Sequence, residues 1–282
     1  MRIGANGYMK YKNADEWIAL IKELEVSTVT APMKYSDSAE VKKSYMDYIR
    51  KYNLVIGEVG IWKNPLSPDA NERKEALRYS KEQLSLADEV KANCCVNIVG
   101  AAGSNWMGYY PENYSEDTYA LIIDTVREII DEVKPKHTFY TIEPMQWMHP
   151  DSPDGYLKLI QDVDRKELAV HLDYANMING IERYHNRKEF INECFRKLGP
   201  YIKSIHAKDL HLGEETPCSI FEVCPGAGEI DFAQVMRLSN KLGSDIPVFV
   251  EHLSSFEEYK AAVGHLRAVG KKNNIDIVTI DF

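Results

Sequence analysis

The chain has 282 residues, 44% of them hydrophobic, and carries a formal net charge of -9 at neutral pH. This length is enough for one large core, and the acidic charge argues against nucleic acid as a partner, because phosphate binding needs a basic surface. No apolar run approaches the roughly 20 residues that span a bilayer. Residues 1–11 lack the apolar stretch of a signal peptide, and the five cysteines show no regular spacing. These features predict a cytoplasmic protein without membrane contact.

Short β-rich runs alternate with charged segments along the whole chain. The runs with strand character are residues 1–6, 27–32, 54–60, 94–100, 137–144, 168–174, 202–209 and 247–253. Several are almost continuously apolar, which is typical of parallel strands in a sheet that is covered on both faces. The alternation therefore predicts repeated strand–loop–helix units.

The charged segments between these runs have the periodicity of amphipathic helices. In residues 14–24 the apolar positions follow the spacing of one helix face, and they are Ala14, Trp17, Ile18, Ile21 and Leu24. Several helix starts are marked by a capping side chain three residues before Glu or Gln. These predicted starts are residues 13–16, 37–40, 69–72, 231–234 and 254–257.

The strand–loop–helix unit repeats about eight times, which predicts a single (β/α)₈ barrel (TIM barrel) domain over residues 1–282. A doubly wound open sheet is the alternative, but no glycine-rich dinucleotide-binding motif follows an early strand. Residues 274–282 have strand character beyond the expected barrel. We expect them to form a C-terminal extension that docks on the barrel or on another subunit.

Four of the predicted strands end on residue types that bind metals. In a barrel of this kind the chemistry lies at the carboxyl ends of the strands. Taken singly, each residue has an ordinary alternative as a helix cap or a surface group, but four at corresponding strand ends predict one site. Three carboxylates and one imidazole suit Mn²⁺, Mg²⁺ or Co²⁺. The residues are Glu143, Asp173, His206 and Glu251.

Side-chain alternation extends this pattern one layer into the barrel. Residues two positions before each predicted ligand face the same way along the strand. We therefore expect a second inward-facing set beneath the ligands, consisting of Thr141, His171, Ser204 and Phe249.

The most specific sequence pieces surround the predicted ligands: "IEP" at 142–144, "HLDYAN" at 171–176, "HAKD" at 206–209, "PGAGEIDF" at 225–232 and "VEHL" at 250–253. With them, the whole chain resembles the xylose-isomerase-like TIM barrels. This family includes sugar phosphate isomerase/epimerase-like proteins and the larger subunit of bacterial C-glycoside-deglycosylating enzymes. The resemblance implies one catalytic divalent metal, Mn²⁺ first, held by the four predicted ligands. It also implies that Glu143 and Glu251 move protons next to a metal-polarised carbonyl.

Two positions differ from the ketose 3-epimerases of that family. Those enzymes have a histidine three residues after the aspartate ligand and an arginine six residues after the histidine ligand. Here the two positions are Asn176 and Leu212. The "HAKD" form instead resembles members that act on keto-cyclitols, keto-acids and oxidised glycosides, some of them by β-elimination.

Further candidates for substrate binding lie near the same strand ends. Trp62 and Trp106 belong to aromatic loops, where they either stack on sugar faces or pack the loops onto the barrel. The polar candidates are Asn6, Glu58 and Asn97, each a hydroxyl ligand or a loop anchor.

Lys208 and Asp209 follow the predicted ligand His206 directly. They are expected to bind substrate oxygens or to pair with each other. His149 lies in the loop beyond Glu143, and its imidazole suits a catalytic acid or base near neutral pH. The alternative for His149 is a surface histidine in a proline-rich turn.

These features predict a metal-dependent enzyme that enolises a sugar or keto-sugar, as an isomerase or epimerase. The main alternative is a lyase that eliminates a leaving group from a keto-sugar, for example by cleaving the C-glycosidic bond of a 3-oxo-glucoside, with His149 as acid. A metal-dependent endonuclease or a non-catalytic sugar-binding protein fits the charge and the ligand set less well. The expected partners are a small sugar or glycoside and further subunits, either identical copies or a small different subunit.

Overall fold

The computed structural model describes residues 1–7 and 9–280. Eight parallel strands form one sheet in the order β1-β10-β7-β6-β5-β4-β3-β2. The Ser27 amide donates to the Ile3 carbonyl over 2.9 Å, so the two end strands nearly close the sheet into a barrel. The strands are β1 (Arg2–Asn6), β2 (Thr28–Thr30), β3 (Val55–Gly60), β4 (Cys94–Asn97), β5 (Tyr140–Ile142), β6 (Leu168–Leu172), β7 (Ile202–His206) and β10 (Pro247–Glu251).

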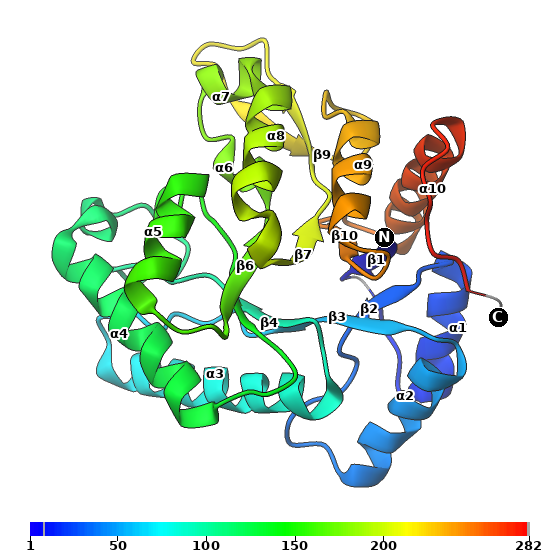
Figure 1. The fold of residues 1–282 in the computed structure, drawn as a ribbon, viewed down its shortest axis with the longest axis horizontal. Helices are drawn as coiled ribbons and strands as arrows, with labels where there is room; N and C mark the ends of the chain where they lie inside the picture. The colour runs from blue at the N-terminus through cyan, green and yellow to red at the C-terminus, as the bar shows by residue number, and fades with distance from the viewer. Residues whose placement is uncertain (8, 281–282) are drawn as a thin grey trace.

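Helices surround this sheet and connect successive strands (Figure 1), which confirms the (β/α)₈ barrel. The main ones are α1 (Ala14–Leu24), α2 (Ala39–Lys51), α3 (Ala70–Val90), α4 (Glu116–Val133), α5 (Pro153–Val163), α8 (Arg187–Leu198), α9 (Phe232–Leu242) and α10 (Phe256–Lys272). Shorter pieces are α6 (Tyr174–Met177), α7 (Ile181–His185), η1 (Pro111–Tyr114) and η2 (Gly199–Tyr201). All five apolar residues predicted for one face of α1 are buried. No described helix has the length and apolar character needed to cross a membrane.

Three of the five predicted helix starts have the predicted capping residue, and in the other two the cap is displaced by one residue. Asn13, Asp69 and Asp231 cap their helices by accepting backbone amides, as predicted. At α2 and α10, however, the caps are Ser38 and Ser255. The Asp37 carboxylate accepts the Lys34 amide in the preceding turn, which makes it unavailable to the helix.

The barrel interior contains the predicted inward-facing layer. Thr141, His171, Ser204 and Phe249 are all fully buried, which confirms their orientation. The Phe249 ring fills the space between Gly4 on β1 and Gly57 on β3. A Cβ atom added at Gly57 would lie 2.6 Å from Phe249 Cε2, so only glycine fits there. The predicted ligands occupy the next layer above.

An antiparallel hairpin interrupts the repeat between β7 and α9. Its strands are β8 (Asp209–Leu212) and β9 (Ile220–Val223), which pair with each other and not with the barrel. The Leu212 amide donates to the Tyr184 hydroxyl of α7 over 2.9 Å, which fixes the hairpin above the barrel end. The run predicted over 202–209 is therefore two elements, since β7 ends at His206.

The C-terminal segment docks on the barrel of its own chain. Residues 275–280 form neither helix nor strand. The Val278 amide donates to the Met1 carbonyl over 2.9 Å, and the Asn240 side chain donates to the Asp276 carbonyl over 2.8 Å. The sequence of this segment favours a strand, but residues 275–280 lie beside the start of β1 without joining the sheet. The last two residues of the predicted extension, 281–282, lie outside the described residues.

We predict that Gly57→Ala lowers the free energy of unfolding by about 1–3 kcal/mol, because the new methyl group overpacks the barrel interior against Phe249. Urea denaturation measures this change. Gly264→Ala is the control, because a Cβ atom at this position of α10 meets nothing within 4 Å. The control should gain about 0.5–1 kcal/mol from helix propensity. Equal stability of wild type and Gly57→Ala would contradict the tight contact.

Candidate metal centre

The structure brings the four predicted ligands together at the carboxyl ends of their strands. Glu143 follows β5, Asp173 follows β6, and His206 and Glu251 end β7 and β10. His206 Nδ1 lies 2.8 Å from Glu251 Oε1, 3.4 Å from Glu143 Oε1 and 3.6 Å from Asp173 Oδ2. All four side chains are buried. The donor atoms lie within 4.8 Å of one another, which is close enough for one ion to contact them all.

The chemistry of this set fits a divalent cation. Within the described part of the chain, four buried atoms of this set make no hydrogen bond, namely His206 Nδ1, His206 Nε2, Asp173 Oδ2 and Glu251 Oε1. Buried polar atoms are normally satisfied, and three carboxylates that share one lysine ammonium and one imidazole leave room for a further cation. Three carboxylates with one imidazole are the donors of a hard to borderline ion. The residues therefore fit the group that the resemblance implies.

Lys208 is the nearest positive charge to this set. Its ammonium nitrogen lies 2.8 Å from Asp173 Oδ2, 2.8 Å from Glu251 Oε1 and 3.8 Å from Glu143 Oε1. Only 2% of the residue is exposed. A lysine tolerates such burial when carboxylates surround its charge. Its side chain thus points into the site.

Asn176 holds two of the ligands in place. Its side-chain nitrogen donates to Glu143 Oε1 over 3.0 Å, and its backbone amide donates to Asp173 Oδ1 over 2.9 Å. Its side-chain oxygen lies 3.5 Å from the Lys208 ammonium. The sequence singled this position out only as a difference from ketose 3-epimerases. Its position three residues after Asp173, at the start of a helix that Asp173 caps, was the available signal.

The environments of the carboxylates differ electrostatically. Burial raises the pKa of Glu143 above its ordinary value, although the charge of His206 opposes this. Burial also opposes ionisation of Glu251, but His206 and Lys208 outweigh it and lower the pKa of Glu251 to about 2. The two glutamates thus differ in their electrostatic surroundings. Burial alone would lower the pKa of His206, but Glu251 and Glu143 raise it well above its ordinary value.

Two cavities flank the cluster. One, of about 260 Å³, lies at the ends of β1, β2 and β3, and its lining includes Asn6, Glu58 and Trp62. Trp62 has a left-handed backbone (φ 54°), and its indole covers Gly60. The other cavity, of about 490 Å³, reaches the cluster through Asn176 and Glu222. Its remaining lining is Gln146, Trp147, Ala175, Ile178, Asn179, Gly180, Ile181, Leu210, Cys218 and Ile220.

Trp147 and Glu222 were not among the predicted site residues. Trp147 follows Glu143 in the same loop and belongs to the larger cavity. Glu222 reaches the site from β9, where its carboxylate lies 3.6 Å from the Lys208 ammonium and 3.1 Å from His252 Nδ1. Only the hairpin brings it there, because Glu222 is separated from every ligand by long stretches of sequence.

Asn97 and Trp106 make contacts typical of structural residues. Asn97 exchanges two hydrogen bonds with the Lys63 backbone, at 3.2 and 3.1 Å, and so fixes the loop after β3. Trp106 is half-buried and packs against the hydrophobic core. Whether either side chain also binds substrate stays a prediction.

Asp209 and Lys208 take different partners although they are adjacent. The Asp209 carboxylate accepts the backbone amides of Leu210, Gly226, Gly228 and Ile230, each over 2.9 Å. It thereby fixes the glycine-containing loop that leads into α9. Lys208 pairs instead with the carboxylates of the ligand set.

His149 packs between two aromatic rings. Its ring centroid lies 5.1 Å from that of Tyr114 and 5.1 Å from that of Tyr119. Burial lowers the pKa of His149, which favours the neutral imidazole near neutral pH. The geometry is that of a packed side chain, and its role as a catalytic acid stays a prediction.

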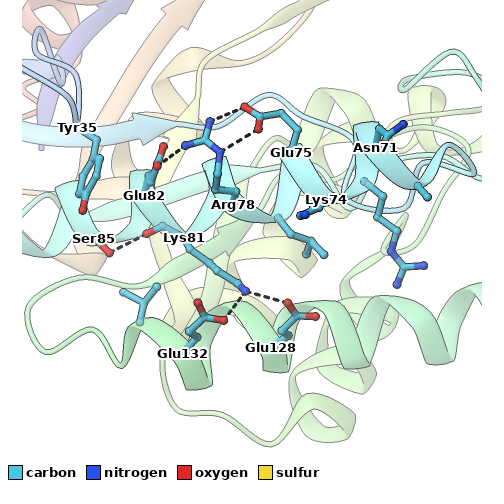
Figure 2. Close-up of a pocket in the computed structure, with 14 residues that line it drawn as sticks. Tyr35, Asn71, Lys74, Glu75, Arg78, Lys81, Glu82, Ser85, Glu128 and Glu132 are labelled. Atoms are coloured by element: carbon cyan, nitrogen blue, oxygen red, sulfur yellow. Dashed lines mark hydrogen bonds and ion pairs between the residues drawn. The ribbon is translucent and has the colours of Figure 1, made fainter.

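A separate groove on the outside of the barrel contains none of the predicted site residues. It lies between α3 and α4, has a volume of about 870 Å³, and is lined largely by charged side chains (Figure 2). Lys81 bridges Glu128 and Glu132 across it, and Arg78 pairs with Glu75 and Glu82. The Lys81 pairs link the two helices, whereas the Arg78 pairs lie within α3.

The fold and the acidic cluster define a (β/α)₈-barrel protein with a candidate metal centre at the carboxyl ends of its strands. The sequence profile of the xylose isomerase-like TIM barrel family matches residues 14–269, so the chain belongs to this family. No curated protein sequence matches the chain.

Solved structures share the fold at low sequence identity. A D-psicose 3-epimerase from Clostridium cellulolyticum H10, solved with D-tagatose, is 16% identical, with a TM-score of 0.67 over 95% of this chain and 99% of that chain. A 3-keto-D-glucoside 4-epimerase from E. coli is 15% identical, with a TM-score of 0.66 over 95% and 99%. A xylose isomerase-like protein from Mycobacterium smegmatis in complex with magnesium is 17% identical, with a TM-score of 0.64 over 94% and 92%.

We predict that Asp209→Ala makes the loop at 225–230 more mobile, because four backbone amides lose the buried carboxylate that accepts their hydrogen bonds. The variant should lose about 2–5 kcal/mol of stability. Hydrogen exchange of the Gly226, Gly228 and Ile230 amides should become faster. Glu229→Ala is the control, since this carboxylate of the same loop pairs with Arg187 at the surface and should contribute under about 1 kcal/mol. Unchanged amide exchange in Asp209→Ala would contradict the anchoring role.

Proposed function

We propose that the protein is a divalent-metal-dependent sugar isomerase or epimerase that enolises a sugar or keto-sugar. The observation that carries this proposal is the convergence of Glu143, Asp173, His206 and Glu251 on one buried point at the strand ends. Those four residues would hold the ion. When bound, the ion supplies Lewis-acid polarisation of the substrate carbonyl. Mn²⁺ is the first candidate, with Mg²⁺ and Co²⁺ as alternatives.

In this proposal the two glutamates transfer the proton. Removal of a proton next to a carbonyl needs a base, and its return to a neighbouring or inverted position needs an acid. Glu143 and Glu251 enter the site from β5 and β10, which are separated in the sheet by β6 and β7. Burial raises the pKa of Glu143, whereas His206 and Lys208 lower that of Glu251 despite burial. Glu143 and Glu251 are therefore assigned together as the pair that transfers the proton.

Lys208 is assigned to the developing negative charge on the substrate oxygen. Enolisation moves charge from the carbon to this oxygen, and a preorganised cation in a water-poor site stabilises it. The Lys208 ammonium is held by Asp173 and Glu251, so its position is fixed before the substrate arrives.

The surroundings support a sugar-sized substrate. The two cavities beside the cluster carry polar groups such as Asn6 and Gln146 together with the indoles Trp62 and Trp147. Such a mixture suits a molecule with hydroxyl groups and apolar C–H faces. The D-psicose 3-epimerase and the 3-keto-D-glucoside 4-epimerase that share this fold act on sugars. The lyase alternative depends on His149 as an acid, and its packing between two tyrosines gives that alternative no specific support.

The first test of this function is exchange of the substrate's carbon-bound proton with solvent deuterium. Ketoses and 3-keto-glucosides are incubated with the protein in D₂O and followed by NMR. Exhaustive chelation should abolish exchange, and added Mn²⁺ should restore it. Glu143→Gln and Glu251→Gln should each slow exchange by about 10²–10⁴. Glu128→Gln, which removes a surface carboxylate of α4, is the control and should exchange normally. Full exchange after chelation would refute the proposal.

A second prediction tests whether Lys208 stabilises charge on the substrate or only neutralises the nearby carboxylates. Lys208→Met removes a cation that lies 2.8 Å from two of the ligand oxygens, so divalent ions should bind at least as tightly as in the wild type. The kcat value should nevertheless fall by about 10²–10³, by analogy with the loss of an oxyanion donor. Calorimetric titration and steady-state kinetics measure the two quantities. An unchanged kcat would show that Lys208 only balances charge.

A further inference from the structure

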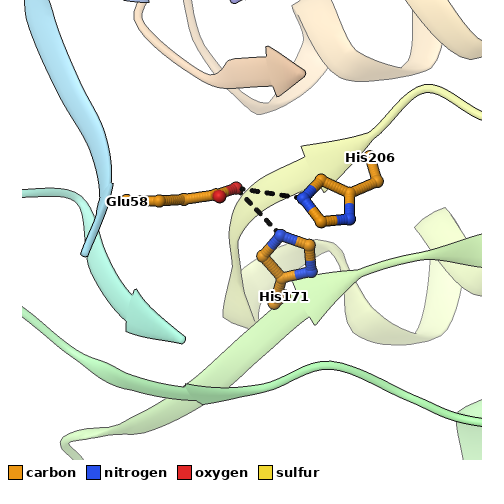
Figure 3. Close-up of side chains that lie close together, drawn as sticks. All are labelled: Glu58, His171 and His206. Carbon is orange, nitrogen blue, oxygen red and sulfur yellow. Dashed lines mark hydrogen bonds and ion pairs between the residues drawn. The ribbon is translucent and has the colours of Figure 1, made fainter. Parts of the chain in front are cut away.

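A second polar layer lies directly beneath the candidate metal centre. It consists of Glu58, His171 and Ser204, and at most 1% of each residue is exposed. Figure 3 shows Glu58 reaching from β3 toward the two histidines on β6 and β7. A buried carboxylate is expensive to maintain without a compensating partner. The position of Glu58 therefore calls for a physical explanation.

One oxygen of Glu58 is the common neighbour of the other polar side chains in this layer and of His206. Glu58 Oε1 lies 2.9 Å from His171 Nε2 and 3.6 Å from His206 Nε2. The Ser204 hydroxyl donates to the same oxygen. His171 and Ser204 are two residues before Asp173 and His206, so strand alternation places them one layer below the ligands.

His206 connects the two layers. Its Nδ1 atom faces Glu143, Asp173 and Glu251, while its Nε2 atom faces Glu58. A neutral imidazole carries its proton on one nitrogen and a lone pair on the other. A carboxylate that faces Nε2 favours the proton there, and this leaves the lone pair on Nδ1, toward the ligand cluster.

We propose that Glu58 is the positioning residue of this metal centre, which selects the His206 tautomer that presents Nδ1 to the ion. His171 and Ser204 in turn hold the Glu58 carboxylate. The inference rests on the proposed metal site and adds a residue that does not touch the ion. The competing explanation is that Glu58 and His171 form a buried structural pair with no effect on His206.

The test is calorimetric titration of Mn²⁺ into chelated protein that carries substitutions at Glu58. Glu58→Gln keeps a side-chain oxygen that can face His206 Nε2 but loses the charge, so affinity should fall by about 10-fold. Glu58→Leu loses both, so affinity should fall by about 100-fold, at the upper end for residues that orient a metal-binding histidine. Cooperative thermal unfolding shows which variants remain folded. If Glu58→Leu does not fold, Glu58→Gln decides the outcome.

A spectroscopic readout reports the His206 tautomer itself. Imidazole ¹H–¹⁵N NMR of the Mg²⁺-loaded protein should show the His206 proton on Nε2 in the wild type and in Glu58→Gln. In Glu58→Leu the proton should no longer be fixed on Nε2. An unchanged tautomer in Glu58→Leu would overturn the proposal, because a purely structural pair predicts no change at His206.

Thr141→Val is the matched control in the same buried layer. The Thr141 hydroxyl donates to the Cys95 carbonyl over 3.2 Å and not to Glu58. Its Mn²⁺ affinity should equal that of the wild type, and a loss as large as that of Glu58→Leu would overturn a specific role for Glu58. Wild-type affinity in both Glu58 variants would also refute it. No Mn²⁺ binding by the wild type would instead refute the proposed metal site.

Discussion

Mutual repulsion of buried carboxylates is the constraint on which the upper half of this barrel depends. Glu143, Asp173 and Glu251 approach His206 from three strands, and Glu58 approaches the same ring from below. Ionised carboxylates in such a place are stable only when cations lie between or beside them. Lys208 supplies part of this charge, and the carboxylates around His206 outnumber it, which favours a divalent ion at the same point.

The barrel makes this concentration of charge possible because parallel strands all end at the same face. Inward-facing positions recur every second residue, so one layer of ligands lies above one layer of supporting residues. Phe249 belongs to this second layer and packs against Gly57 of β3. This close packing limits the relaxation that would separate the carboxylates.

Features outside the strands adapt the family's barrel in this chain. Asn176 holds Glu143 and Asp173 by hydrogen bonds. The hairpin of β8 and β9 brings Glu222 to Lys208 and His252, and so closes one side of the site. Asp209 fixes the loop behind this hairpin. These contacts shape the cavity that reaches the cluster.

The sequence by itself determined the barrel, its strands and the four candidate ligands, because strand alternation and parallel pairing are local rules that fix which end and which face a residue occupies. Capping motifs likewise gave five helix starts to within one residue. Only the tertiary structure decided the contacts between distant strands. Glu58 reaches His206 across the barrel, and Asn176 reaches Glu143 from the short helix α6. The first contact depends on the curvature of the whole sheet and the second on the pairing of β5 with β6, which no short stretch of sequence encodes.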